Sequence, residues 1–459
     1  MTDDPRLARA HHLLAVDRPE AAASELTAFL GDAPDSVEAR LLLAQASLRL
    51  ERYDDASAHA ADAVRLAPDH ALPHRVRARV ELARGRLDVA DEAIAESIRL
   101  EPREPDAHGI RAMIRVERKE WREALAAAEE GLELDAENSR CTNLAAIALT
   151  RLGEESRAAE VLRGQLARSP DDPLTHANQG WTELHAGRYD RALEHFREAL
   201  RLDPEQDWAR RGVLEALRAR HRLYRPILRY FLWMDRLSSR AQFGILFGGW
   251  IAYQGVRTLA ADDSPLRPLL LLLAAAYLVF ALSTWFATPL ANGLLCLSRF
   301  GRLALTGWEK LASAVVVPLL LVGILAVLGA LGEAAVLPGL VVGLLAFPLA
   351  VTFQMTERKA RGAMLAFTLL VAALGGALVV RSREAAREAA ALRARVETIA
   401  ARGGEADGIG APDPEIERRR DAYEEAREAA GGLAIAVLVL AFFGSQVAGV
   451  AAGRWASRR

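Results

Sequence analysis

Ten histidines and two cysteines are the residues of this 459-residue chain best suited to bind metals or act as nucleophiles. All the histidines lie at or before His221, and none belongs to a metal-ligand motif such as H-E-x-x-H. Cys141 and Cys296 stand far apart, without zinc-ligand spacing or a disulfide framework. Phosphate-binding G-x-x-x-x-G-K-[ST] loops and G-x-S-x-G nucleophile turns are absent from the sequence. We therefore expect no catalytic, cofactor or metal site, and interpret the protein as a non-enzyme.

The charge balance excludes an electrostatic nucleic-acid binder. Lys and Arg number 58 against 60 Asp and Glu, for a formal net charge of −2. The arginines are interspersed with acids along the first half of the chain, so no basic footprint for nucleic acid forms. Arginine far outnumbers lysine and alanine is abundant, which is typical of a GC-rich bacterial genome.

A strict period of 34 residues organises the first part of the chain. Counting units from residue 3, position 32 holds proline in five of six units: Pro34, Pro68, Pro102, Ala136, Pro170 and Pro204. Position 20 is always alanine: Ala22, Ala56, Ala90, Ala124, Ala158 and Ala192. Position 8 is always small: Ala10, Ala44, Ala78, Ala112, Ala146 and Gly180. Small residues allow paired helices to approach closely, and proline ends a helix. The period predicts a stacked array of helix pairs.

The repeats resemble the tetratricopeptide repeat family. The sixth unit carries the resemblance most fully: Asn178, Gly180, Leu184, Gly187, Tyr189, Ala192, Phe196, Ala199, Leu202 and Pro204. An aromatic residue at position 17 recurs as Tyr53, Trp121 and Tyr189, whereas Leu87 replaces it in the third unit and Glu155 in the fifth. The resemblance covers residues 3–206 and implies an α-solenoid of six helix pairs.

The resemblance also implies a binding groove lined by the first helix of each unit. Positions 2, 5, 9 and 12 line this groove in the family, and here they give His11, Gln45, Arg75, Arg79, Met113, Asn143, Ile147 and Trp181. This partly basic, partly apolar set suits an extended or helical peptide with some acidic character. The family's clamp for a terminal carboxylate is matched only in part, by Arg75, Arg79 and Asn143. The alternative is that these residues merely solvate the groove.

Two amphipathic segments follow the array. Residues 207–224 carry Trp208 and Leu214 on one face, as expected of a cap helix that covers the last unit. Residues 225–240 alternate aromatic and aliphatic residues with arginines, which predicts an interfacial helix at a membrane surface. Its alternative interpretation is the first turns of a membrane span.

Beyond residue 240 the sequence contains long uncharged runs. A helix needs ~20 apolar residues to cross a bilayer. These runs predict about six spans. Five lie within residues 241–380, at 241–260, 268–290, 311–332, 334–355 and 362–380, and the sixth is 432–453. No ionisable residue lies deep in a span, which disfavours proton-coupled transport. Gly339 and Gly343 form a close-packing motif that we expect to join spans within one bundle.

Basic residues in short loops set the predicted orientation. Arginines and lysines gather before the first span, between spans two and three, between spans four and five, and in the tail 454–459. All four sites lie on one side of a six-span bundle, which the positive-inside rule assigns to the cytoplasm. The N-terminus MTDDPRLARAHH is polar and does not read as a signal peptide. We expect a multi-pass protein of the bacterial cytoplasmic (inner) membrane, with the array and C-terminus cytosolic.

The loop 381–431 has a pattern of its own. Ala385, Ala389 and Leu392 begin a four-three spacing typical of a coiled-coil seam, and Asp413 with Pro414 suits the start of a second helix. These signals predict a charged helical hairpin on the outside. It either merely connects two spans or serves as a sensor or docking element.

Together these features predict an all-α protein that recruits or assembles partner proteins at the membrane through its repeat groove. Lipid is the second expected partner, nucleic acid is not expected, and the sequence does not indicate an oligomeric state. Two alternatives are a transporter or membrane enzyme in the six-span bundle regulated by the array, and a sensor that uses the outer hairpin.

Overall fold

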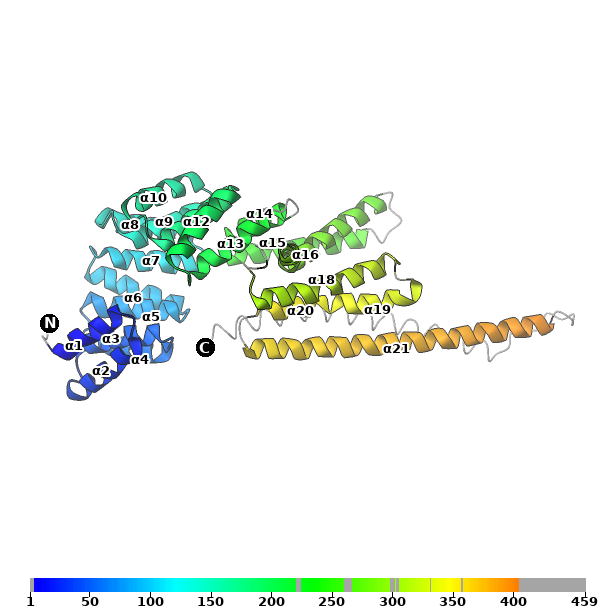
Figure 1. The fold of residues 1–459 in the computed structure, drawn as a ribbon, viewed down its shortest axis with the longest axis horizontal. Helices are drawn as coiled ribbons and strands as arrows, with labels where there is room; N and C mark the ends of the chain where they lie inside the picture. The colour runs from blue at the N-terminus through cyan, green and yellow to red at the C-terminus, as the bar shows by residue number, and fades with distance from the viewer. Residues whose placement is uncertain are drawn as a thin grey trace. The chain divides into compact units, whose positions relative to one another are not determined.

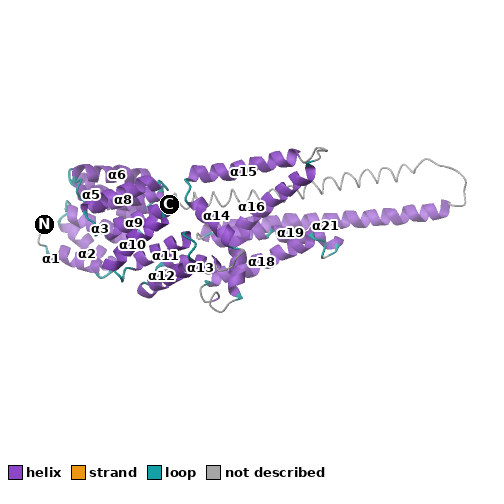
Figure 2. Cartoon of the chain, turned by 90° about the horizontal axis from the view of Figure 1, so that it is seen from above, coloured by secondary structure: helices purple, strands orange, loops and turns teal. Residues whose placement is uncertain are grey.

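The computed structural model describes residues 4–219, 224–259, 266–297, 302, 305–330, 332–355 and 358–403. Every regular element in these residues is an α-helix (Figure 2), which confirms the all-α prediction for this part of the chain. The chain divides into two compact units, Met1–Tyr277 and Leu278–Arg459.

Six helix pairs follow one another in the first unit, one pair for each 34-residue interval (Figure 1). The first helices are α1 (Pro5–Ala15), α3 (Val37–Arg49), α5 (Ala71–Ala83), α7 (Pro105–Glu117), α9 (Ser139–Leu152) and α11 (Pro173–His185). The second helices are α2 (Pro19–Asp32), α4 (Tyr53–Leu66), α6 (Leu87–Leu100), α8 (Trp121–Leu134), α10 (Glu155–Arg168) and α12 (Tyr189–Leu202). The predicted solenoid of six pairs is confirmed.

The chain reverses within each unit through a left-handed residue at position 15. The φ angle is positive there in all six units: Asp17 (54°), Glu51 (57°), Gly85 (72°), Lys119 (58°), Gly153 (86°) and Gly187 (76°). Such a residue ends a helix because its backbone turns out of the right-handed spiral. The next unit then begins with a side-chain cap in several cases, as where Asn138 Oδ1 accepts a hydrogen bond from the Cys141 amide at 3.0 Å.

The small residues at positions 8 and 20 lie at the helix contacts, as predicted. Ala44 and Ala56, for example, are both fully buried. In the sixth unit, a methyl group added at Gly180 would lie 2.6 Å from a ring atom of Phe196. Real side chains never approach so closely, so glycine at this position is what admits the phenylalanine ring.

Successive first helices pack against one another along the whole array, from α1 against α3 to α11 against α13. The second helices do not pack against each other to a comparable extent. The first helices therefore line the inner face of the solenoid, and the second helices cover its outside. This arrangement presents one side of the first helices to any ligand of the inner face.

Four helices continue the chain beyond the repeats: α13 (Asp207–Ala219), α14 (Arg225–Asp235), α15 (Ser239–Leu259) and α16 (Arg267–Cys296). Helix α13 packs against α11 and α12. Helix α14 contacts α13, and the Tyr224 hydroxyl just before it donates a 2.9 Å hydrogen bond to Glu215. Tyr224 and Leu228 are both buried, so the start of α14 is anchored to the end of the array.

The second unit contains α18 (Gly307–Val327), α19 (Glu333–Leu344), α20 (Ala346–Gln354) and α21 (Arg358–Gly403). Gly343 packs on Gly323 of α18, where an added methyl group would lie 2.7 Å from the Gly323 Cα atom. Gly339 packs on Ala326 in the same way. The close-packing motif thus joins two helices of one chain, as the sequence predicts.

Three segments of the described residues are long and apolar enough to cross a membrane: Gly307–Ala326, Ala335–Phe353 and Ala360–Glu384. They overlap the third, fourth and fifth predicted spans. The first two predicted spans overlap α15 and α16, which are not among these three. The sixth predicted span, 432–453, lies outside the described residues, as does the tail 454–459.

Helix α21 runs without interruption through 46 residues, from Arg358 to Gly403. The outer loop predicted at 381–431 therefore begins as a continuation of the helix that holds the fifth predicted span. The remainder of that loop, with the second helix of the hairpin, lies outside the described residues, so the coiled-coil seam stays a prediction.

Candidate functional site

A cluster of arginines lies on the inner face of the array. Arg75 and Arg79 come from α5, Arg140 from α9, and Arg49 from the end of α3. The charges of these three neighbours act on Arg79, together with the carboxylate of Asp106. Arg79 is thus the common member of a group of four cations.

Arg75 and Arg140 are paired with carboxylates, whereas Arg79 is not paired among the described residues. Arg75 Nη1 lies 2.8 Å from Glu104 Oε2, and Arg140 Nη1 lies 3.2 Å from Asp106 Oδ1. Arg79 is exposed, and among the residues that the structure describes it forms no ion pair. Crowding by the neighbouring helices is the largest cause that lowers the pKa of the Arg79 guanidinium, and the charge of Arg140 adds to it. An arginine stays protonated in spite of such a shift, so Arg79 offers a free positive charge.

An apolar patch continues the inner face toward the end of the array. The Trp181 ring stacks on the Trp208 ring, with centroids 4.5 Å apart and planes inclined by 26°. Trp181 Nε1 donates a 3.2 Å hydrogen bond to the Trp208 carbonyl. A half-open hollow of about 10 Å³, the size of one water molecule, lies beside them. Its lining is Ile147, Thr150, Arg151, Asn178, Trp181, Thr182, His185 and Trp208.

The eight residues proposed from sequence form two pairs and four separate positions. Arg75 and Arg79 share the basic cluster, and Ile147 and Trp181 share the small hollow. His11 is exposed at the first unit and lies 3.4 Å from Glu38, Gln45 is half-buried, and Met113 packs against the core of the fourth unit.

Asn143 has a structural task in the packed interior. It is 3 % exposed, and its Nδ2 donates to Thr175 Oγ1 at 3.0 Å. Its Oδ1 accepts a hydrogen bond from Asn178 Nδ2 at 2.8 Å. These bonds join units five and six, and they direct the amide away from the solvent-exposed part of the inner face.

Sequence reasoning missed two members of the basic cluster, Arg49 and Arg140. Arg140 stands at position 2 of its unit, one of the positions used for the groove, so a signal for it existed. Arg49 stands at position 13, outside that set, and joins the cluster through the stacking of α3 on α5.

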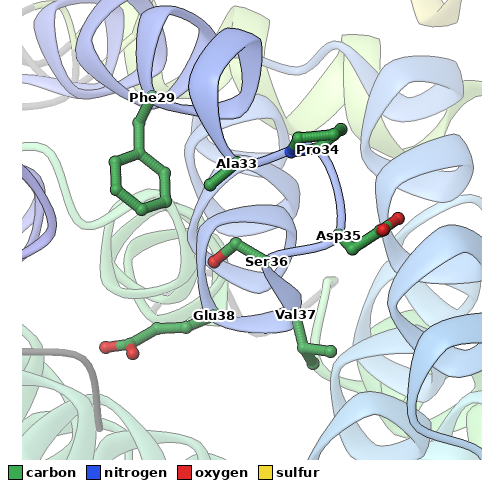
Figure 3. A pocket seen from close by; sticks show the side chains of 7 residues that line it. All are labelled: Phe29, Ala33, Pro34, Asp35, Ser36, Val37 and Glu38. Carbon is green, nitrogen blue, oxygen red and sulfur yellow. The ribbon is translucent and has the colours of Figure 1, made fainter.

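An open depression lies elsewhere, at the junction of units one and two (Figure 3). It has a volume of about 600 Å³ and is lined by Phe29 and by residues 33–38. Ser36 uses its hydroxyl to cap α3, accepting a 3.3 Å hydrogen bond from the Ala39 amide. None of the eight proposed residues lines this depression. Among the described residues, no three His, Cys, Asp or Glu side chains are grouped as metal ligands.

Comparison with known proteins identifies the repeats. Tetratricopeptide repeat models match residues 13–80, 75–139 and 173–206. The N-terminal array is therefore built of tetratricopeptide repeats. The three matches leave uncovered residues 140–172, which are almost the whole of the divergent fifth unit.

Solved structures with a similar fold include the APC/C hetero-tetramer Cut9-Hcn1, at 19 % identity and a TM-score of 0.42. That match covers 46 % of this chain and spans 42 % of the length of that one. PilW, a type IV pilus biogenesis factor, matches at 19 % identity and a TM-score of 0.37, over 46 % of this chain and 94 % of its own. PilF of Pseudomonas aeruginosa matches at 16 % identity and a TM-score of 0.35, over 48 % of this chain and 96 % of its own. No curated protein matches the chain.

Proposed function

We propose that this protein is a membrane-anchored scaffold that recruits or assembles partner proteins by binding an acidic peptide segment on the inner face of its repeats. Tetratricopeptide arrays are generally scaffolds for protein–protein interaction. The observation that carries the finer proposal is the free charge of Arg79 within the basic cluster of Arg49, Arg75, Arg79 and Arg140.

The inner face supplies both parts of a peptide site. The basic cluster attracts carboxylates, and hydrogen bonds to charged groups contribute about 1.5–3 kcal/mol each. Farther along, Ile147 and the Trp181–Trp208 stack offer apolar contact for side chains of the same peptide. An extended or helical segment with acidic residues followed by apolar ones would match this order.

The membrane half of the proposal rests on the apolar helices of the second unit. Three of them are compatible with a membrane anchor. We propose the six-span arrangement in the bacterial inner membrane, with the array and both chain ends in the cytoplasm, because the short loops rich in arginine and lysine would then share one side.

The peptide site is tested by a binding measurement on the full chain in detergent micelles. The probe is a fluorescent peptide in which glutamates are followed by leucines, and its counterpart carries glutamine in place of glutamate. We expect the acidic probe to bind more tightly, and Arg75→Glu with Arg79→Glu to weaken it tenfold or more.

The matched control is Arg99→Glu with Arg201→Glu. Both arginines are exposed on second helices, where they pair with Glu96 and Glu198, and the pair changes the net charge by the same amount. Equal loss of binding in both double variants would show a non-specific charge effect. Equal binding of the two probes would contradict the proposal.

A further inference from the structure

The turns inside the repeat units form a continuous edge of the array. In units two to four this edge is closed by ion pairs between neighbours. Arg84 Nη2 lies 2.6 Å from Asp54 Oδ1, and Arg118 Nη2 lies 2.8 Å from Asp88 Oδ1. Each pair joins position 14 of one unit to position 18 of the unit before it.

The series of ion pairs ends after unit four. Position 14 is Leu152 in unit five and Ala186 in unit six, so neither can continue it. In its place, the end of α14 lies on this edge. Asp235 Oδ1 lies 3.0 Å from Lys119 Nζ, and Asp235 Oδ2 lies 2.5 Å from Arg151 Nη1. One carboxylate outside the repeats thus joins unit four to unit five.

The next residue, Arg236, makes a second set of contacts on the same edge. Its Nη2 lies 2.5 Å from Glu155 Oε1. Its carbonyl accepts a 2.7 Å hydrogen bond from Trp121 Nε1. Gly153 provides the space, because a methyl group there would lie 2.9 Å from Arg236 Nη1. Consecutive acidic and basic residues are therefore each matched by the opposite charge on the array.

These contacts give a reason for the unusual residue at position 17 of unit five. Position 17, aromatic as Tyr53, Trp121 and Tyr189 in other units, is Glu155 here. An aromatic ring at this position would leave the Arg236 guanidinium without its carboxylate. The fifth unit departs from the repeat pattern at the residue that holds the segment following the array.

His185 lies inside the same contact. Its Nε2 is 3.1 Å from Arg151 Nη1, and its Nδ1 is 3.5 Å from Arg236 Nη2. Burial is the main cause that lowers the pKa of His185, to about 3, and the charges of Arg151 and Arg236 lower it further. The neutral ring can accept a hydrogen bond from Arg151, but a protonated ring has no acceptor to offer either guanidinium.

The charges around His185 already favour the neutral ring. Lys119, Arg151 and Arg236 contribute three positive charges to the contact, and Asp235 and Glu155 contribute two negative ones. Protonation of His185 would raise the excess from one positive charge to two. This repulsion is reduced most readily if Arg236, which comes from outside the repeats, leaves the contact.

We propose that Asp235 and Arg236 and the turn edge of units four to six form a releasable clasp, which fixes α14 to the array and opens when His185 is protonated. The occupant of the edge is this chain's own segment. The Nε atom of Arg236 is buried with no hydrogen-bond partner among the described residues, which weakens the closed state. The clasp goes beyond the scaffold function and does not depend on it.

The clasp predicts a definite response to pH. In the open state His185 loses the Arg236 charge and gains water, so its pKa returns toward about 6.5, the ordinary value. A group whose pKa is lower in the closed state binds protons preferentially in the open one. Lowering the pH from 7.5 to 5.5 should therefore raise the ratio of open to closed molecules by up to about tenfold.

The test is a distance measurement by electron paramagnetic resonance on the full chain in detergent micelles. Spin labels replace Glu160, exposed on α10, and Trp233, exposed near the end of α14. Cys296 is changed to serine, and the buried Cys141 is left in place. We expect one narrow distance at pH 7.5, and a broad distribution at pH 5.5 or with Arg236→Glu. Adding Glu155→Arg to Arg236→Glu should restore the narrow distance at pH 7.5.

Two further variants make the result decisive. His185→Gln should keep the distance narrow at pH 5.5, because no group is left to protonate at that position. Arg157→Glu changes an exposed charge on α10, the helix of Glu155, and should leave the distances at both pH values as in the wild type. An unchanged distance in Arg236→Glu would overturn the clasp, and an equal pH response in His185→Gln would overturn the role of His185. Neither readout involves a partner peptide, so failure here is distinguishable from failure of the scaffold proposal.

Discussion

Glu155 and Arg236 are 81 residues apart in the chain, and their side chains meet at 2.5 Å. Glu155 occupies the position that carries tyrosine or tryptophan in half of the repeat units, and Arg236 belongs to the segment beyond the cap helix. The pair gives a reason for the carboxylate at this position of an internal repeat, where the two neighbouring units carry an aromatic residue. A repeat array usually relaxes its pattern at its ends, where capping is needed. Here the internal departure serves a contact with a segment outside the repeats.

Placing an aromatic residue at position 155 should therefore bring unit five closer to the repeat pattern and open the clasp. In Glu155→Tyr we expect the melting temperature of the array to stay within a few degrees of wild type. Amide hydrogen exchange of residues 225–236 should accelerate tenfold or more, because Arg236 loses its partner. Glu160→Tyr, on an exposed position of the same helix, is the control. Unchanged exchange in Glu155→Tyr would show that the ion pair does not hold α14.

Gly180 should be intolerant of even a single methyl group. Its Cβ would lie 2.6 Å from Phe196, so Gly180→Ala should destabilise the array by about 1–3 kcal/mol. Gly164 in α10 has no atom within 4 Å of such a methyl group, and Gly164→Ala should stabilise it by up to about 1 kcal/mol through helix propensity. Thermal unfolding followed by circular dichroism measures both. The same sign for the two variants would contradict this account of the small-residue ladder.

Acid should destabilise the array through His185. Its pKa is about 3 in the folded protein and near 6.5 in the unfolded chain. Between these values the unfolded state binds more protons, so stability falls as pH drops below about 6.5. We expect a loss of about 1 kcal/mol between pH 7.5 and pH 5.5, smaller in His185→Gln. Urea unfolding at the two pH values measures the difference, and an identical loss in both proteins would assign the effect to other groups.

Gly343 should be needed for the packing of α18 on α19. A side chain at Gly343 would meet the backbone of Gly323, which cannot move aside as a side chain can. Gly343→Val should lower the melting temperature of the chain in detergent. Gly376→Val is the matched change, because no atom lies within 4 Å of its Cβ. If both variants have the same melting temperature, the close contact contributes nothing to the stability of the bundle.

The repeating features of the fold could be predicted from the sequence, but the contacts between the repeats and the segment beyond them could not. The six helix pairs followed from small residues and prolines at fixed intervals, since each interval reports one local packing rule. The clasp could not be found in this way, because Asp235 and Arg236 belong to no period and their partners are distant in sequence. Asn143 shows a third case. Its position on the first helix was the one expected of a groove residue, but the contacts with Thr175 and Asn178 turn its amide into the interior.

Helix α21 makes the membrane topology testable with two labels. Its 46 residues extend for about 69 Å, more than twice the roughly 30 Å hydrocarbon core of a bilayer. If residues 360–384 cross the membrane, the two ends of this one helix must lie on opposite sides. With Cys296 changed to serine, a cysteine at Lys359 should react with a membrane-impermeant maleimide only from the cytoplasmic side. A cysteine at Thr398 should react only from the other side. Labelling of both from one side would contradict a membrane crossing by α21, and with it the six-span arrangement.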